Sequence, residues 1–380
     1  MTTFEPAAAV TRVARHSLRP NLAGASGNAV SLAIGEPDFD TPDVIVESAI
    51  EALRGAETHY ANQNGLPELR EAVAGALSRI AGDPFTADQV LITHGATAAL
   101  AAAVLGIVDP GDRVVIPEPC YSLYPDLVRL AGGEPVPVAP AADFHWDLDA
   151  LREAVRGARL VVFANPANPT GVVHREEELR ALGEFLAGTG TLVLADEAYD
   201  AIVYPPNRFH SALSIESLRD RVVYAQTLSK TYAMTGWRVG YLGGPAEVVQ
   251  AASRIHRTVN GSLNTAVQRA ACTALANGPV LAEPMLAEYR ERRTALCERL
   301  TEIPGLSANP PEGTFYLFAR YAPGVSSVEF AARLRESGVL VRPGSEYGAS
   351  GEGHVRFSFA TGTDRIHLAM DRVAACLRDW

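Results

Sequence analysis

A repeated alternation of apolar runs, polar loops and helical segments begins at Gln89 and constrains the fold most strongly. Strand-like runs recur at residues 89–93, 113–116, 160–164, 192–195 and 222–226. Strands separated by helices in this way predict an α/β fold with a parallel sheet. Each run is followed directly by polar residues, and open α/β sheets bind ligands beyond the carboxyl ends of their strands. The sequence therefore predicts a ligand site along that edge.

Lys230 is the only lysine in the chain, which otherwise uses arginine for its side-chain cations. A guanidinium stays protonated, whereas a primary amine can lose its proton and condense with an aldehyde to a Schiff base. Chance survival on a solvated helix end is the alternative explanation of a single lysine. The neighbours Ser229, Thr231 and Arg238 favour a chemical role, because hydroxyls and a fork-shaped cation can hold a phosphate. A Schiff-base lysine beside a phosphate site indicates pyridoxal phosphate.

The segment 229–241, Ser-Lys-Thr-Tyr-Ala-Met-Thr-Gly-Trp-Arg-Val-Gly-Tyr, closely resembles the cofactor-lysine signature of class I/II aminotransferases. Further blocks match this family in order, from Gly-Glu-Pro-Asp at 35–38 to His-Val-Arg-Phe-Ser-Phe at 354–359. The resemblance implies the α/β fold type I, with a mainly parallel seven-stranded sheet flanked by helices and a smaller α+β domain. The expected division is an N-terminal arm with part of the small domain (1–45), a large cofactor-binding domain (46–284) and a small C-terminal domain (285–380).

The resemblance also implies a role for each matching residue. Lys230 carries the cofactor, Asp196 faces its pyridine nitrogen, and Tyr199 donates to its phenolic oxygen beside Asn168. Tyr121 stacks on the pyridine ring, with Tyr124 as the alternative. The remaining cofactor contacts are expected from Thr227 and, at the phosphate, from Ala96, Thr97, Ser229, Arg238 and, across a homodimer interface, Tyr60. The substrate is expected to contact Gly35, Asn168 and Arg356.

Local sequence gives a separate reading of four of these positions. Ala96 and Thr97 open a predicted helix, and the free N–H groups of a helix N-terminus attract anions. Asp196 directly follows a buried strand, where a carboxylate is costly unless a cation faces it; a helix N-cap is the alternative. Arg356 alternates with apolar residues in a predicted strand, a pattern usual for a solvated arginine, whereas the family match makes it the bidentate clamp for the substrate α-carboxylate.

Charge and composition restrict the partners. The net charge of −11 and the pI of about 5.4 disfavour nucleic-acid and anionic-membrane partners, which require a basic face. No uncharged apolar run is long enough to span a bilayer and no signal-peptide core is evident, so a cytoplasmic location is expected. The four cysteines are far apart in the sequence and predict structural thiols without a metal site.

The implied reaction moves an amino group between an L-amino acid and a 2-oxo acid. Other pyridoxal-phosphate chemistry, such as a carbon–sulfur lyase or an amino-acid oxidase, is the first alternative. A non-enzymatic ligand sensor is the second. In aspartate-specific members of the most similar subgroup a lysine of a Gly-x-Lys-Gln block binds the distal carboxylate, whereas Thr97 stands at the aligned place here. Neutral, aromatic or basic amino acids are therefore the expected substrates.

Further elements are predicted outside the repeat. Residues 1–30 form an arm with one short helix, and a helix over 42–54 is expected to be capped by Thr41. A strand is predicted over 237–243, and helices over 246–257, 263–277 and 286–300. The small domain is expected to contain strands over 315–319, 339–342 and 354–360.

Overall fold

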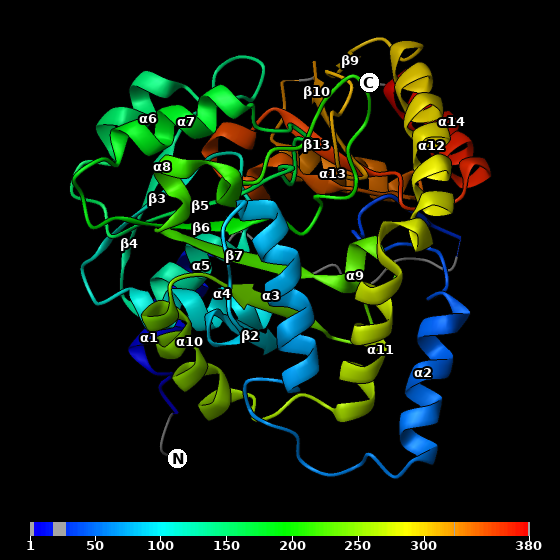
Figure 1. Ribbon diagram of the computed structural model, residues 1–380. Coiled ribbons are helices and arrows are strands. Elements are labelled where there is room, and N and C mark those ends of the chain that lie inside the picture. Colours follow the sequence, from blue (N-terminus) through cyan, green and yellow to red (C-terminus); the bar gives the residue numbers. More distant parts are fainter. Residues whose placement is uncertain (1–3, 18–27, 323, 379–380) are drawn as a thin grey trace.

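The computed structural model describes residues 4–17, 28–322 and 324–378, and residues 1–3 and 18–27 of the predicted arm lie outside these ranges. A seven-stranded sheet forms the centre, with the strand order β2-β8-β7-β6-β5-β3-β4 (Figure 1). Its strands are β2 (Val90–Thr93), β3 (Arg113–Pro117), β4 (Glu134–Val138), β5 (Leu160–Ala164), β6 (Leu192–Asp196), β7 (Val222–Thr227) and β8 (Gly240–Gly243).

Only β8 runs against its neighbours, because it pairs antiparallel with both β2 and β7. The other neighbouring strands pair in parallel. The predicted mainly parallel, seven-stranded sheet is therefore confirmed. β4 is the strand that the sequence did not reveal, and the predicted strand over 237–243 begins only at Gly240.

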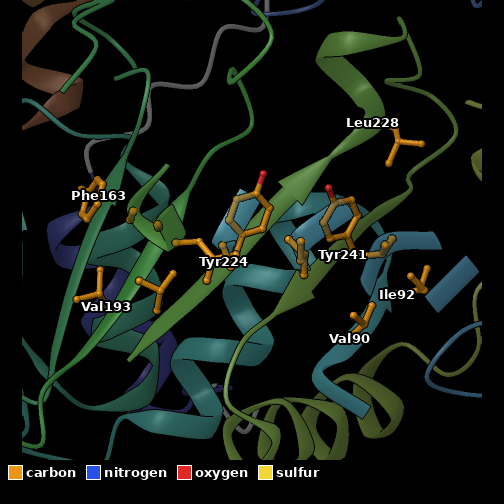
Figure 2. Packing of buried hydrophobic residues seen from close by; sticks show 14 of the residues in the cluster. Val90, Ile92, Phe163, Val193, Tyr224, Leu228 and Tyr241 are labelled. Carbon is orange, nitrogen blue, oxygen red and sulfur yellow. The ribbon is translucent and has the colours of Figure 1, made fainter. Parts of the chain in front are cut away.

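Helices cover both faces of this sheet because its strands are apolar on both sides. In β5, Val161 and Phe163 enter one core, whereas Leu160, Val162 and Ala164 enter the core on the other face. The first core, part of which is drawn in Figure 2, also includes the stacked rings of Tyr224 and Tyr241 on the neighbouring strands β7 and β8. Its helices are α2 (Asp43–Arg54), α3 (Pro67–Ala81), α6 (Leu148–Ala154), α7 (Glu176–Phe185) and α11 (Thr265–Asn277).

The opposite core is formed by three helices, α4 (Gly95–Ile107), α5 (Leu123–Ala131) and α10 (Ala246–Val259). The arm contains the predicted short helix, α1 (Ala8–His16), which packs against α5 through a bond from Arg12 Nε to the carbonyl oxygen of Arg129. Two one-turn helices complete this part of the chain, α8 (Glu216–Arg219) and α9 (Leu228–Thr231).

A smaller α+β unit with its own hydrophobic core lies beside the sheet, as predicted (Figure 1). Its antiparallel sheet has the order β12-β13-β10-β9, and a separate parallel pair joins β1 to β11. The strands are β1 (Val30–Ser31), β9 (Leu306–Ser307), β10 (Tyr316–Tyr321), β11 (Val339–Leu340), β12 (Arg342–Pro343) and β13 (His354–Ser358). Its helices are α12 (Glu283–Thr301), α13 (Ser327–Glu336) and α14 (Thr363–Arg378). The domain boundaries given above remain a prediction.

Two local predictions are wrong. The Thr41 side chain does not cap α2; its hydroxyl donates to the carbonyl oxygen of Ala233 and accepts from Trp237 Nε1, so it joins the loop before α2 to the loop after α9. The predicted strand over 339–342 is two strands in different sheets, β11 and β12. Among the described helices, none combines the length and apolar character needed to cross a bilayer.

Candidate active site

The polar residues that follow the central strands meet in one cavity of about 360 Å³ at the edge of the sheet. β2, β3, β5, β6 and β7 run in the same direction, so their carboxyl ends lie along this edge. β8 runs the other way and contributes through the residues before it, which include Arg238. The predicted site residues that line the cavity are Gly35, Ala96, Thr97, Tyr121, Asn168, Asp196, Tyr199, Thr227, Ser229, Lys230, Arg238 and Arg356.

Lys230 reaches this cavity from the short helix α9, which begins where β7 ends. Its partly buried amine donates a hydrogen bond of 2.6 Å to the carbonyl oxygen of Gly35. Burial lowers the pKa of Lys230 below the ordinary lysine value; Tyr316 and Glu36 oppose this shift, and Arg356 and Arg238 reinforce it. The lysine is therefore easier to deprotonate than one on the surface.

Asp196 is the last residue of β6 and is almost fully buried. One carboxylate oxygen accepts from the Tyr124 hydroxyl at 2.8 Å, and the other accepts from the Ala198 amide at 3.3 Å. A turn follows, so the alternative of a helix N-cap is wrong. Burial raises the pKa of Asp196 to about 6, although the bond from Tyr124 opposes the shift. Among the described residues, no cation is bonded to this carboxylate, and a buried anion of this kind is stabilised by a cationic ligand.

Arg356 lies in β13 and enters the cavity from the side opposite the sheet. Its side chain is buried, so the alternative of a solvated arginine is wrong. Nη1 donates to Asn168 Oδ1 at 2.8 Å and Nη2 donates to the carbonyl oxygen of Ala33 at 2.7 Å. Within the described part of the chain, its Nε atom is buried without a hydrogen-bond partner. A buried guanidinium with N–H groups to spare is suited to a carboxylate.

The opposite end of the cavity carries hydroxyl, amide and guanidinium donors. The hydroxyls of Thr227 and Ser229 are 2.8 Å apart, and α4 begins beside them. Arg238 has the left-handed backbone angle φ of +54° and donates from Nη1 to the carbonyl oxygen of Thr235 at 2.8 Å. A Cβ atom on Gly95, at the start of α4, would lie 2.9 Å from Arg238 Nη2. Glycine therefore lets the guanidinium lie close to the helix N-terminus, where an anion is favoured.

Of the predicted cofactor contacts, Tyr60 alone is outside this cavity. Its side chain is 100% exposed in the single chain, and it lines a separate surface pocket with residues 57–59, His94 and residues 262–265. The structure places it on the surface that includes the segment before α11. This chain alone therefore does not bring Tyr60 to its own cavity.

The family model for aminotransferase class I and II matches residues 28–372. The chain belongs to this family. It is 36% identical to an aspartate aminotransferase of Pyrococcus abyssi, over 94% of each chain, and 37% identical to aromatic-amino-acid aminotransferase 2 of Thermococcus litoralis, over 92% of each. The solved aromatic aminotransferase from Pyrococcus horikoshii OT3 has a TM-score of 0.90 and 34% identity, covering 98% of this chain and 99% of that one.

Class I and II aminotransferases depend on pyridoxal phosphate, and this member has residues that fit it. The donors at Thr227, Ser229 and Arg238 suit a phosphate, whereas the buried Asp196 suits a protonated pyridine nitrogen. Lys230 carries the one side-chain amine of the chain and lines the same cavity. The cavity therefore contains side chains that suit the phosphate, the pyridine nitrogen and the aldehyde of the cofactor.

Several cavity residues of this aminotransferase were missed by the sequence reasoning. They include Ile34, Glu36, Leu100, Thr235, Tyr316, Arg342, Glu346 and Tyr347. Tyr124 was considered only for ring stacking, yet its hydroxyl bonds Asp196. Tyr316 lies in β10 and Arg342 in β12, the two strands that pair with β13, which contains Arg356; cross-strand pairing cannot be read from a single sequence.

Proposed function

We propose that this aminotransferase transfers amino groups from a range of amino acids that is not restricted to aspartate, with Lys230 as the residue that holds the cofactor and moves the substrate proton. The observation that carries the proposal is the shared cavity: the lysine amine, the buried Asp196 carboxylate and the Arg356 guanidinium all line it. A cation for a carboxylate, an anion for a pyridinium and an amine for proton transfer are the groups that the reaction requires.

Pyridoxal phosphate, when bound, supplies an electron sink that makes the substrate α-proton acidic. Asp196 keeps the pyridine nitrogen protonated, and Tyr199 and Asn168 donate to the phenolic oxygen. Arg356 holds the α-carboxylate and so fixes which bond at the α-carbon faces the lysine. The lowered pKa of Lys230 makes its neutral amine available as the general base.

The remaining phosphate and ring contacts complete the proposed site. The backbone of Gly35 lies at the substrate, and the ring of Tyr121 stacks on the pyridine. The phosphate is held by Ala96, Thr97, Thr227, Ser229 and Arg238. Thr97 and Arg238 are exposed in the single chain, which agrees with a site completed by a second subunit.

The proposal includes a homodimer, and the exposed position of Tyr60 supports it. Tyr60 is fully exposed in the single chain, and the proposed contact buries it at the phosphate of a neighbouring subunit. Mixing the inactive variants Lys230→Arg and Tyr60→Ala tests this directly, because a mixed dimer retains one intact site. Restored activity on mixing is expected; mixtures that stay as inactive as the separate variants would contradict a shared site.

The substrate range is inferred from the charges in the cavity. Besides the proposed ligands Arg238 and Arg356, the lining contains Arg342, and this arginine is paired with Glu346 at 3.3 Å. The exposed Ile34 adds an apolar wall. Because Arg342 is already paired and Ile34 is apolar, this part of the cavity supports substrates with a neutral or aromatic side chain over substrates with a second carboxylate. A panel of amino donors with one fixed 2-oxo acid measures this, and turnover of aspartate alone would refute it.

Two experiments test the reaction and the lysine. Nitrogen should pass stoichiometrically from the amino acid to the 2-oxo acid; ammonia released without an acceptor would instead indicate a lyase or an oxidase.

Borohydride reduction should fix the cofactor on the peptide that contains Lys230, and Lys230→Arg should abolish both the label and turnover. Label on another peptide would overturn the assignment. A cytoplasmic location remains a prediction.

A further inference from the structure

Tyr316, at the start of β10, contacts two residues of the proposed machinery, Tyr199 and Arg356. Its hydroxyl is 2.9 Å from the hydroxyl of Tyr199, and both side chains are buried. Its ring lies under the guanidinium of Arg356, with 3.9 Å between Cζ and the ring centroid. One side chain therefore bridges the group proposed to bind the substrate carboxylate and the group proposed to bind the cofactor oxygen.

The surrounding backbone fixes Tyr316 in this position. A Cβ atom on Gly35 would lie 1.7 Å from the Tyr316 hydroxyl oxygen, so this oxygen packs directly against the glycine. The amide of Tyr316 donates to the side chain of Thr314 at 3.0 Å, and Thr314 has the left-handed φ of +62°. A left-handed backbone conformation costs free energy in a residue other than glycine, and such strain is concentrated at functional sites.

The direction of the bond between the two hydroxyls follows from the proposed role of Tyr199. Each hydroxyl has one proton to donate. Burial raises the pKa of Tyr199 well above its ordinary value, so this residue stays protonated. If Tyr199 gives its proton to the cofactor phenolic oxygen, the bond from Tyr316 must run towards Tyr199. The arginine over the ring draws electron density from Tyr316 and makes it a better donor.

We propose that Tyr316 is a positioning residue that couples the two ends of the site: its ring supports the Arg356 clamp, and its hydroxyl donates to Tyr199 and strengthens the bond of Tyr199 to the cofactor. This inference rests on the proposed function, and it adds a second donor behind the first. The two contributions come from different atoms of one side chain, so they can be separated by substitution.

The hydroxyl is tested by the pH dependence of the absorption of the bound cofactor. A hydrogen bond donated to the phenolic oxygen makes this oxygen a weaker acceptor for the proton of the adjacent cofactor–lysine linkage. The loss of a donor therefore raises the pH at the midpoint of the absorption change. A hydrogen bond to a charged oxygen corresponds to roughly one to two pH units, which is the rise expected for Tyr199→Phe. Cooperative strengthening is a fraction of that, so Tyr316→Phe should raise the midpoint by roughly 0.2 to 0.5 unit.

Tyr347→Phe is the matched control. The Tyr347 ring also faces Arg356, at 5.2 Å, and within the described residues its buried hydroxyl has no hydrogen-bond partner. The pH midpoint of the Tyr347→Phe variant should equal that of the wild type. A midpoint for Tyr316→Phe equal to wild type, or an equal rise in Tyr347→Phe, would overturn the inference while a shifted Tyr199→Phe sustains the proposed function. An unshifted Tyr199→Phe would refute the proposed role of Tyr199 and the inference with it.

The ring is tested by the affinity for 3-phenylpropanoate, a carboxylate without an amino group. Tyr316→Phe keeps the ring under Arg356 and should keep the dissociation constant within about two-fold of wild type. Tyr316→Leu removes the ring and should weaken binding about five-fold or more, the loss expected for one buried cation–π contact. Equal weakening in both variants would show that the ring does not support the clamp.

Discussion

Replacing Asp196 with asparagine should have opposite effects on the protein without cofactor and on the protein with it. Burial raises the pKa of this carboxyl from an ordinary 3.8 to about 6. The folded protein therefore binds the Asp196 proton more tightly than the unfolded chain does. Its contribution to stability is complete below pH 3.8 and is lost as the pH rises through about 6. Two pKa units correspond to about 3 kcal/mol at pH 7.

The asparagine variant removes this penalty, because a neutral amide can still accept the hydroxyl of Tyr124. Without cofactor, Asp196→Asn should therefore gain free energy of unfolding relative to the wild type as the pH rises, by about 2 kcal/mol between pH 4.5 and 7. With cofactor the order reverses, because the variant lacks the anion that faces the pyridine nitrogen. Urea unfolding at several pH values, with and without pyridoxal phosphate, measures both effects.

Glu197→Gln is the matched control for this experiment. Glu197 is the next residue, is completely buried, and does not line the cavity; burial raises its pKa to about 8. Its glutamine variant should also gain stability without cofactor, yet keep the stabilisation by pyridoxal phosphate. The reasoning is refuted if the stability difference between Asp196→Asn and the wild type does not change with pH, or if both variants respond equally to the cofactor.

Three further substitutions have defined outcomes. Arg356→Lys loses the planar fork, so the KM for amino acids should rise roughly 30-fold, about 2 kcal/mol; steady-state kinetics checks this. Burial opposes protonation of His145, but bonds to Glu178 and Glu312 outweigh it and raise its pKa to about 9. His145→Gln should therefore remove up to about 3 kcal/mol of stability that the wild type has below pH 6.5 and loses through pH 9, seen in urea unfolding. Gly35→Ala should displace the hydroxyl of Tyr316 and weaken the binding of a carboxylate inhibitor, which inhibitor titration measures.

The central sheet could be predicted because buried parallel strands are apolar on both faces and polar immediately after their last residue. The edge strand β4 could not be predicted, because Pro135 and Pro137 lack the backbone N–H groups that a strand normally donates. The amide of Glu134 bonds towards β3, and prolines at alternate positions place their missing donors on the free edge. An edge strand can thus contain residues that would exclude an interior strand.

Asp196 was predictable because a carboxylate directly after a buried strand is expensive, and Lys230 because it is the only lysine of the chain, whereas Arg356 was predicted from the family match alone. Thr41 was misplaced for the opposite reason: a hydroxyl before a helix suits a cap, but the loop after α9 offers it two partners instead. Tyr316 carried no signal, since a tyrosine in an apolar run is usually a core residue, and Tyr124 was expected only as the alternative for ring stacking. Their roles depend on contacts between segments far apart in the chain.

The bonds of Arg356 indicate how a substrate could enter without dismantling the site. A guanidinium has five N–H groups, and within the described residues two of them are used, by Asn168 and by the carbonyl of Ala33. Those two bonds tie β13 to the loop after β5 and to the segment after β1, which holds the plane of the guanidinium in one orientation. Since Nε has no partner in the described part of the chain, a carboxylate can add to a preoriented cation, and little side-chain entropy remains to be lost on binding.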